Sequence, residues 1–187
     1  LKEGKKNWTV KWTVSGGNNI AQPIVVDGTL VLISAGYGKG CGLIEVSQTA
    51  GEFSAKLIWE NKRLKNKFTS SVLHEGHIYG LDSSGSGGTG GGDGANLVSV
   101  KAQTGDEVWR GENYGHGQLL LAQGHLIIQC ENGDLALVKA SPDSHQPVAR
   151  LPSLPVEEFP DLVLLDTLSL TQDESDEATS FCRKMHV

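Results

Sequence analysis

The stretch Pro-Ile-Val-Val-Asp-Gly-Thr-Leu-Val-Leu-Ile-Ser at residues 23–34 has two counterparts farther along the chain. They read Ser-Val-Leu-His-Glu-Gly-His-Ile-Tyr-Gly-Leu-Asp at 71–82 and Leu-Leu-Leu-Ala-Gln-Gly-His-Leu-Ile-Ile-Gln-Cys at 119–130. The turn glycines of the three stretches, Gly28, Gly76 and Gly124, are spaced 48 residues apart. Glycine tolerates the positive φ that two-residue hairpin turns require. Each stretch therefore predicts a tight β-hairpin, turning at Asp27-Gly28, Glu75-Gly76 or Gln123-Gly124.

Two further β-rich runs follow each hairpin. The third run of each unit covers 42–46, 96–100 or 134–138, and the fourth covers 55–59, 106–109 or 146–150. Trp12, Trp59 and Trp109 recur at spacings of 47 and 50 residues. Four strands in about 48 residues are typical of a β-propeller blade. The sequence therefore predicts an all-β fold, a partial β-propeller of about three four-stranded antiparallel blades with an irregular C-terminal tail.

The predicted repeats occupy 8–150, divided at about 12–59, 59–109 and 109–150. Three blades do not close a ring, because propellers use about four to eight. An open array leaves apolar blade faces uncovered. We therefore expect either a protein partner or further propeller blades to cover the exposed faces.

The stretch from Leu97 to Arg110 resembles the tryptophan-docking motif of PQQ-like (quinoprotein alcohol dehydrogenase-like) β-propeller repeats. The matching residues are Ala102, Thr104, Gly105 and Trp109, while Lys101 stands where that family usually has Asp. The first unit keeps only Trp59 of this motif, and the third unit has no tryptophan. The resemblance implies a tight turn at Thr104-Gly105 and a tryptophan packed between neighbouring blades.

The resemblance is to bacterial PQQ-like repeat proteins of the non-catalytic type. It implies a scaffold or protein-interaction platform in an extracytoplasmic location, periplasmic or secreted, as in propeller-type outer-membrane assembly factors. The alternative is a fragment of a PQQ-dependent quinoprotein oxidoreductase, which would bind PQQ and calcium. Active members of that class often carry a vicinal disulfide, and the chain has no Cys-Cys pair. We therefore predict no cofactor, and Asn18, Asn19, Gln22 and Gln118 are the only amide candidates for an axial site.

Charge is divided unevenly along the 187 residues, which carry a net charge of −6. Residues 1–150 are neutral, with 14 basic and 14 acidic side chains, whereas 151–187 carry 2 basic and 8 acidic ones. A neutral body lacks the basic surface that nucleic-acid binding requires. No apolar run is long enough to span a membrane, and no signal peptide opens the chain at Leu1.

Other motifs receive mostly structural interpretations. Glycines 85, 87 and 90 form GxGxxG within a Gly-rich insertion at 83–94, but a strand rather than a helix is expected next. The basic stretch 62–67 predicts a solvated rim loop, or a contact with an anion or an acidic partner. The acidic 151–187 predicts a partly disordered tail, in which an apolar run either caps the last blade or stays loosely attached.

Histidines and cysteines do not form a metal-binding pattern. His74, His77, His116 and His125 lack a metal-ligand spacing, and we predict no metal site. Cys41, Cys130 and Cys182 predict free thiols, with one long-range disulfide as the alternative. Tyr37 and Tyr114 allow a further hypothesis, carbohydrate binding by aromatic side chains at one rim. An Asn-x-Thr sequon at Asn7 is close to chance.

Overall fold

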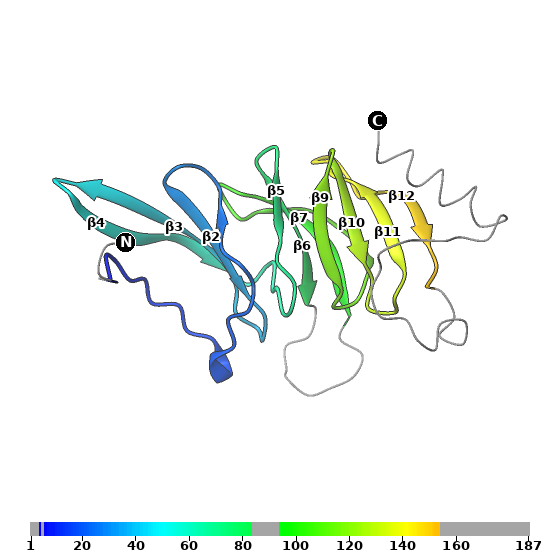
Figure 1. Cartoon of the computed structure of the whole chain (residues 1–187), viewed down its shortest axis with the longest axis horizontal. Helices are drawn as coiled ribbons and strands as arrows, with labels where there is room; N and C mark the ends of the chain where they lie inside the picture. Colours follow the sequence, from blue (N-terminus) through cyan, green and yellow to red (C-terminus); the bar gives the residue numbers. More distant parts are fainter. Residues whose placement is uncertain (1–3, 5, 84–93, 154–187) are drawn as a thin grey trace.

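The computed structural model describes residues 4, 6–83 and 94–153, and it contains three four-stranded sheets in sequence order (Figure 1). Blade 1 consists of β1 (Ile24–Val25), β2 (Leu30–Ala35), β3 (Gly40–Thr49) and β4 (Glu52–Asn61). Blade 2 consists of β5 (Val72–His74), β6 (His77–Ser83), β7 (Ala95–Lys101) and β8 (Glu107–Asn113). Blade 3 consists of β9 (Gln118–Ala122), β10 (His125–Gln129), β11 (Leu135–Lys139) and β12 (Gln146–Leu151).

Every blade is an antiparallel meander in which each strand pairs with its neighbours in sequence. The predicted all-β fold of three four-stranded antiparallel blades is therefore confirmed. A short 3₁₀ turn, η1 (Ser15–Gly17), precedes the first blade. Residues 84–93 of the Gly-rich insertion and residues 154–187 of the acidic tail lie outside the described residues.

Blade 2 packs against both of its neighbours, so apolar side chains on both faces of its strands are buried. Ile78 on β6 belongs to the apolar cluster shared with blade 1, whereas the adjacent Tyr79 belongs to the cluster shared with blade 3. Likewise, Val98 of β7 faces blade 1 and Leu97 faces blade 3. Successive strand residues point to opposite faces, so a sheet covered on both sides becomes apolar at nearly every position.

The hairpins of blades 2 and 3 turn through two residues. Glu75 and Gly76 have φ values of 47° and 75°, and Gln123 and Gly124 have values of 46° and 71°. Two consecutive positive φ values characterise the type I′ turn, whose twist matches that of the flanking strands. The glycine at the second position adopts this conformation without steric strain.

The first hairpin differs from the prediction. Val26 N donates a hydrogen bond to Leu30 O at 2.8 Å, so three residues rather than two form the loop. The Asp27 carboxylate accepts hydrogen bonds from the backbone N–H groups of Thr29 and Leu30, each at 2.9 Å. These two bonds lower the pKa of Asp27 and close the loop. The predicted two-residue turn at Asp27-Gly28 is wrong because the aspartate side chain replaces the turn that glycine would allow.

Candidate interaction site at the blade junctions

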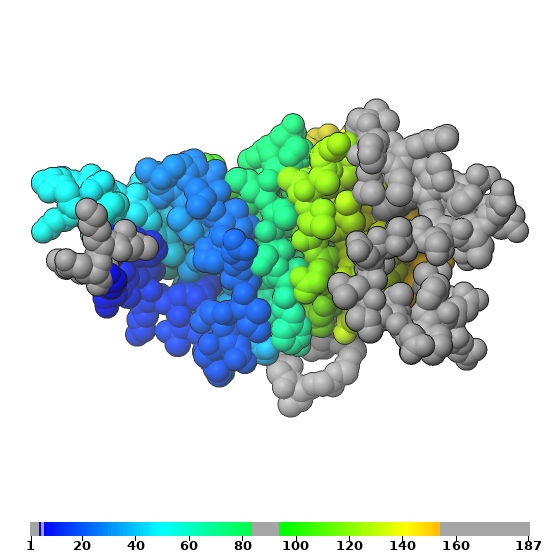
Figure 2. Space-filling view, in the orientation of Figure 1, coloured from blue at the N-terminus to red at the C-terminus, as the bar shows by residue number. Residues whose placement is uncertain are grey.

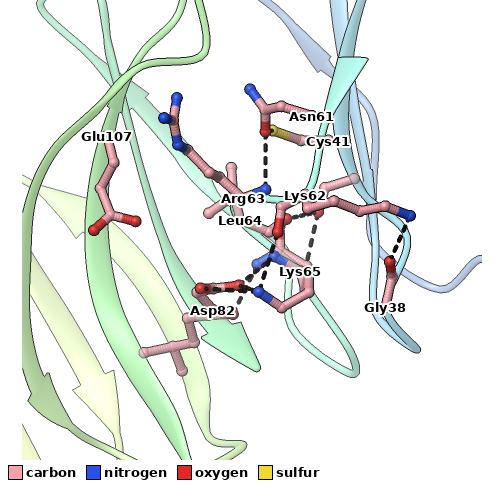
Figure 3. Close-up of polar contacts among 12 residues, drawn as sticks. Gly38, Cys41, Asn61, Lys62, Arg63, Leu64, Lys65, Asp82 and Glu107 are labelled. Atoms are coloured by element: carbon pink, nitrogen blue, oxygen red, sulfur yellow. Dashed lines mark hydrogen bonds and ion pairs between the residues drawn. The ribbon is translucent and has the colours of Figure 1, made fainter. Parts of the chain in front are cut away.

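A buried carboxylate of blade 2 binds the linker that enters this blade from blade 1 (Figure 3). Asp82, near the end of β6, is 1% exposed. Its Oδ1 accepts a hydrogen bond from Lys65 N at 2.7 Å, and the Lys65 ammonium lies 3.0 Å from the same oxygen. Its Oδ2 accepts a hydrogen bond from Arg110 Nη2 at 2.7 Å, and Arg110 also contacts Glu107 at 2.7 Å. Two cations therefore compensate the buried charge, as burial requires.

The basic linker is partly buried rather than fully solvated. Leu64 has a φ of 51° and is fully buried in the apolar cluster between blades 1 and 2. The Ser34 hydroxyl donates to Leu64 O and accepts a hydrogen bond from Asn66 N at 3.1 Å. Asn66, 1% exposed, donates through Nδ2 to Leu81 O at 3.2 Å. The linker is therefore fixed to both blades, and the prediction of a solvated loop is wrong for Leu64 and Asn66.

Cationic side chains of the same linker make the remaining contacts. Lys62 Nζ donates to Gly38 O at 3.0 Å, in the β2–β3 turn. Arg63 Nη1 lies 3.3 Å from Asp106 Oδ1 and donates to Gly105 O at 3.2 Å. The Arg63 and Asp106 side chains are both about half exposed, so this ion pair contributes little stability. Its effect is to orient the linker against the β7–β8 turn.

Trp59 docks on the β7–β8 turn of the next blade. Its indole N–H donates to Gln103 O at 2.7 Å. Gly105 has a φ of 71°, and a Cβ at this position would lie 2.6 Å from the Trp59 ring. Ala102 is fully buried and donates through its N–H to Gly76 O at 3.0 Å. Glycine is therefore required at 105 both for the turn and for the approach of the tryptophan.

Trp109 repeats this contact at the second junction. Its indole N–H donates to Ser141 O at 2.9 Å, and its ring lies beside Tyr79 and His145. In blade 3, Ala140 N donates to Gly124 O at 2.9 Å, as Ala102 N donates to Gly76 O in blade 2. Sequence reasoning missed this second docking turn because it lacks Thr-Gly. The shared word Val-Lys-Ala at 100–102 and 138–140 was the available signal.

Trp12 does not dock in the same way. It is half-buried over Gly42 of β3, where a Cβ would lie 3.0 Å from the ring, and the Lys39 ammonium lies 4.0 Å from the ring centroid. Its buried indole N–H has no hydrogen-bond partner among the described residues. Trp12 therefore packs on blade 1 without the carbonyl contact that Trp59 and Trp109 make.

The remaining predicted repeat residues occupy turns. Gly28 lies in the three-residue loop between β1 and β2, and Gly76 and Gly124 lie in the type I′ turns. Thr104 Oγ1 donates to Asp106 Oδ2 at 2.8 Å, and this bond lowers the pKa of Asp106. Together with Gly105, Thr104 therefore shapes the turn on which Trp59 docks.

The candidate ligand side chains do not converge on one site. His77 and His125 each place Nδ1 3.0 Å from a carbonyl of their own turn, those of Glu75 and Gln123. Within the described residues, no group of three histidine, cysteine or acidic side chains is arranged to hold a metal ion. Gln118 Nε2 donates to Phe68 O at 3.3 Å, and Gln22 N donates to Ser70 Oγ at 2.9 Å. Asn18 and Asn19 are exposed.

Tyr114 is not available for carbohydrate binding. It is 3% exposed, and its hydroxyl lies 2.9 Å from His145 Nε2. Burial raises the pKa of Tyr114 to about 12 and lowers the pKa of His145. The hypothesis that Tyr37 and Tyr114 together bind a sugar is therefore wrong, because Tyr114 belongs to the junction between blades 2 and 3.

The two described cysteines are free and buried. Burial raises the pKa of Cys41 to about 12 and also raises the pKa of Cys130. These thiols are therefore protonated at neutral pH and unreactive. Cys182 and the GxGxxG glycines lie outside the described residues.

No protein-family model and no curated protein sequence matches the chain. Among solved structures, the crystal structure of BamB from Moraxella catarrhalis is similar, with a TM-score of 0.48 and 15% sequence identity. The similarity covers 71% of this chain and 36% of BamB, which is a PQQ-like β-propeller protein. The chain thus spans about a third of the length of that protein. No helix in the described residues is long and apolar enough to cross a membrane.

Proposed function

We propose that the repeats at 8–150 form a non-catalytic propeller segment that acts as a scaffold for binding another protein. The observation that carries this proposal is the outer face of blade 1, which the chain covers only in part. The apolar side chains of the two internal junctions form buried clusters, whereas on this outer face Phe53 and Leu57 reach solvent. The resemblance to PQQ-like repeats supports an extracytoplasmic location for the role.

The outer face of blade 1 can be identified from the strand register. Leu43 pairs with Trp59 and faces blade 2, so the next pair, Ile44 with Leu57, faces outward. Phe53, which pairs with Gln48, has the same orientation as Leu57. Phe53 is 41% exposed and Leu57 is 36% exposed. The β3–β4 hairpin that carries them forms one end of the molecule, with N-terminal residues beside it (Figure 2, cyan and blue).

Residues 6–14 cover only part of this face. Within the segment, Val10 and Trp12 are half-buried and Val14 is 5% exposed, while Thr9, Lys11 and Thr13 are exposed. This alternation is that of a strand with one apolar side. Trp8 remains 39% exposed. Exposed apolar groups clustered in this way mark a surface for a protein partner or a further blade.

The test compares end-face variants in a partner-capture experiment on the full chain. A Phe53→Asp/Leu57→Asp double variant should lose the partner that the unchanged chain retains from an extract of its source cells. Val108→Asp is the matched control, because Val108 is 37% exposed but lies on β8 of the middle blade. If the double variant captures as much of the partner as the unchanged chain does, the proposal is contradicted.

A cofactor titration separates this role from the oxidoreductase alternative. The folded chain is titrated with pyrroloquinoline quinone and calcium, and the heat of binding is measured by calorimetry. The scaffold proposal expects no heat of binding. One-to-one binding at micromolar concentration or tighter would overturn it and favour the quinoprotein fragment.

A further inference from the structure

A cluster of four side chains lies where both inter-blade linkers and the β2–β3 turn meet. Lys67 and Phe68 belong to the first linker, His116 to the second, and Tyr37 to the turn. The Lys67 ammonium lies 5.7 Å from the Tyr37 ring centroid and 5.6 Å from that of Phe68. The Phe68 and His116 rings meet edge to face, with centroids 6.0 Å apart. We call these four residues the rim cluster.

Lys67 differs from the cations around it. Lys39 contacts Glu60 at 2.9 Å and Lys65 contacts Asp82 at 3.0 Å. Lys67, by contrast, forms no ion pair within the described part of the chain, and two aromatic rings flank its ammonium group. A cation held between rings is oriented but keeps its full charge for an anionic group.

Tyr37 occupies a backbone conformation that an aromatic residue rarely adopts. The turn from Gly36 to Lys39 is closed by a hydrogen bond of 3.0 Å from Lys39 N to Gly36 O. Tyr37 has a φ of 54° and Gly38 one of 76°, as in a type I′ turn. The first position of such a turn favours Asn, Asp or Gly, so tyrosine is strained there. Strain of this kind is often retained where a side chain has a function.

Phe68 supplies an exposed apolar surface, and the His116 ring supports it from one edge. Phe68 is 49% exposed, and its carbonyl is fixed by Gln118 Nε2 at 3.3 Å. His116 is held through its backbone N–H, which donates to Glu131 Oε2 at 2.9 Å. The buried His116 Nε2 has no hydrogen-bond partner among the described residues. Because this nitrogen is covered by the protein, His116 supports the Phe68 ring and does not itself present a polar group to a partner.

We infer that the rim cluster binds a segment of a partner protein that presents a carboxylate beside an apolar side chain. Lys67 pairs with the carboxylate, and Phe68 and Tyr37 contact the apolar group, while His116 supports the Phe68 ring from its edge. Aromatic side chains that contact a partner beside one fixed charge are typical of binding hot spots. The inference rests on the proposed scaffold role, but it concerns a different surface from the outer face of blade 1.

The carboxylate has two possible sources, an Asp or Glu side chain and a free C-terminus. Two random peptide libraries, one displayed internally and one with free C-termini, are therefore selected against the folded full chain. Enrichment of Asp or Glu next to an aromatic or aliphatic residue in the first library indicates a side-chain carboxylate. Enrichment of apolar C-terminal residues in the second library indicates a terminal carboxylate. Either result is expected, and selection of no peptide would overturn the inference.

Affinity measurements then assign the selected peptide to the rim cluster. Lys67→Met and Phe68→Ala should each weaken binding about tenfold or more, measured by fluorescence anisotropy. The matched controls are Lys56→Met and Val108→Ala, because Lys56 is an exposed lysine on β4 and Val108 an exposed apolar residue on β8. Both controls should bind as the unchanged chain does.

Three outcomes would contradict the inference. If Lys67→Met and Phe68→Ala both bind the peptide as the unchanged chain does, the peptide binds elsewhere. If the selected peptides carry no carboxylate, Lys67 does not have the proposed role. If no peptide is selected and the rim cluster instead binds a uronic-acid oligosaccharide, the cluster is a sugar-binding site. The capture experiment changes only Phe53 and Leu57, which are not part of the rim cluster. A failure of the rim inference would therefore not decide whether the chain acts as a scaffold.

Discussion

The two junctions between blades share a backbone pattern but differ in their side chains. At the first, Lys65 N donates to the Asp82 carboxylate at 2.7 Å and Ser83 N donates to Lys65 O at 3.1 Å. At the second, His116 N donates to the Glu131 carboxylate at 2.9 Å and Glu131 N donates to Tyr114 O at 3.0 Å. Each linker is therefore fixed by a carboxylate acceptor and a returning backbone bond.

The difference lies in how each carboxylate is surrounded. Asp82 is 1% exposed and lies between Lys65 and Arg110, whereas Glu131 is exposed. A buried charge needs a counter-charge, while an exposed one is solvated by water. The blade geometry thus sets the backbone bonds, and the depth of each acceptor decides whether cations accompany it. At the second junction the buried side-chain contact is instead the neutral pair of Tyr114 and His145.

The largest expected effect comes from removing the charge at the first junction. Asp82→Asn leaves Lys65 and Arg110 without their buried counter-charge and should lower the free energy of unfolding by about 3 kcal/mol. Glu131→Gln, the matched change at the second junction, should cost less than about 0.5 kcal/mol because that carboxylate is exposed. Urea unfolding monitored by circular dichroism measures both. Equal losses for the two variants would show that burial does not distinguish the junctions.

The docking turn of the first junction gives the next largest effect. Gly105→Ala combines a positive φ with a Cβ placed 2.6 Å from the Trp59 ring, and we expect a loss of about 2 kcal/mol. Gly51→Ala, with a φ of 86° and no atom within 4 Å of the added Cβ, serves as the control for backbone strain alone. It should cost about 1 kcal/mol. If the two costs are the same, the tryptophan does not restrict position 105.

The indole hydrogen bonds should contribute about equally at the two junctions. Trp59→Phe and Trp109→Phe each remove a donor to a turn carbonyl and should each cost about 1 kcal/mol more than Trp12→Phe. Trp12 is the internal control because its N–H has no partner among the described residues. Thermal and urea unfolding of the three variants test this. A cost for Trp12→Phe as large as the others would mean that ring packing, rather than the hydrogen bond, dominates.

The smallest expected effect is a pH dependence confined to the second junction. Burial lowers the pKa of His145 in the folded chain, so the unfolded chain binds more protons near the ordinary value of about 6.5. The contribution of His145 to the free energy of unfolding should therefore be complete above about pH 6.5. It should decrease as the pH falls below that value, because protonation then favours the unfolded chain. His145→Gln should flatten this part of the urea-midpoint profile, whereas Asp82→Asn should not. An unchanged slope in His145→Gln would refute the role of His145.

Local patterns in the sequence predicted the repeat architecture. The glycine spacing located all three hairpins, and Ala102, Thr104 and Gly105 lie in the turn on which Trp59 docks. Such features are encoded within a few residues, so they can be recognised without knowledge of the fold. The loop at Gly28 shows the limit of this reasoning, because an Asp27 side chain took over the closure of the turn.

Contacts between distant residues were not predictable in this way. Asp82 binds Arg110 across 28 positions of the sequence, and neither residue has a local motif. Leu64 lies within a basic stretch but is fully buried, because the linker inserts it between two blades. The rim cluster likewise gathers Tyr37, Phe68 and His116 from three separate segments. Only the assembled sheets determine which of these side chains meet.

The placement of the tryptophans gives each junction its own fluorophore. Trp59 lies at the first junction and Trp109 at the second, and each donates to a carbonyl of the following blade. When a junction opens, its indole exchanges that carbonyl for water, and its emission should shift to longer wavelength. A pair of variants that both lack Trp8 and Trp12, and that each keep only one of the two junction tryptophans, would thus report which blade separates first, without any attached label.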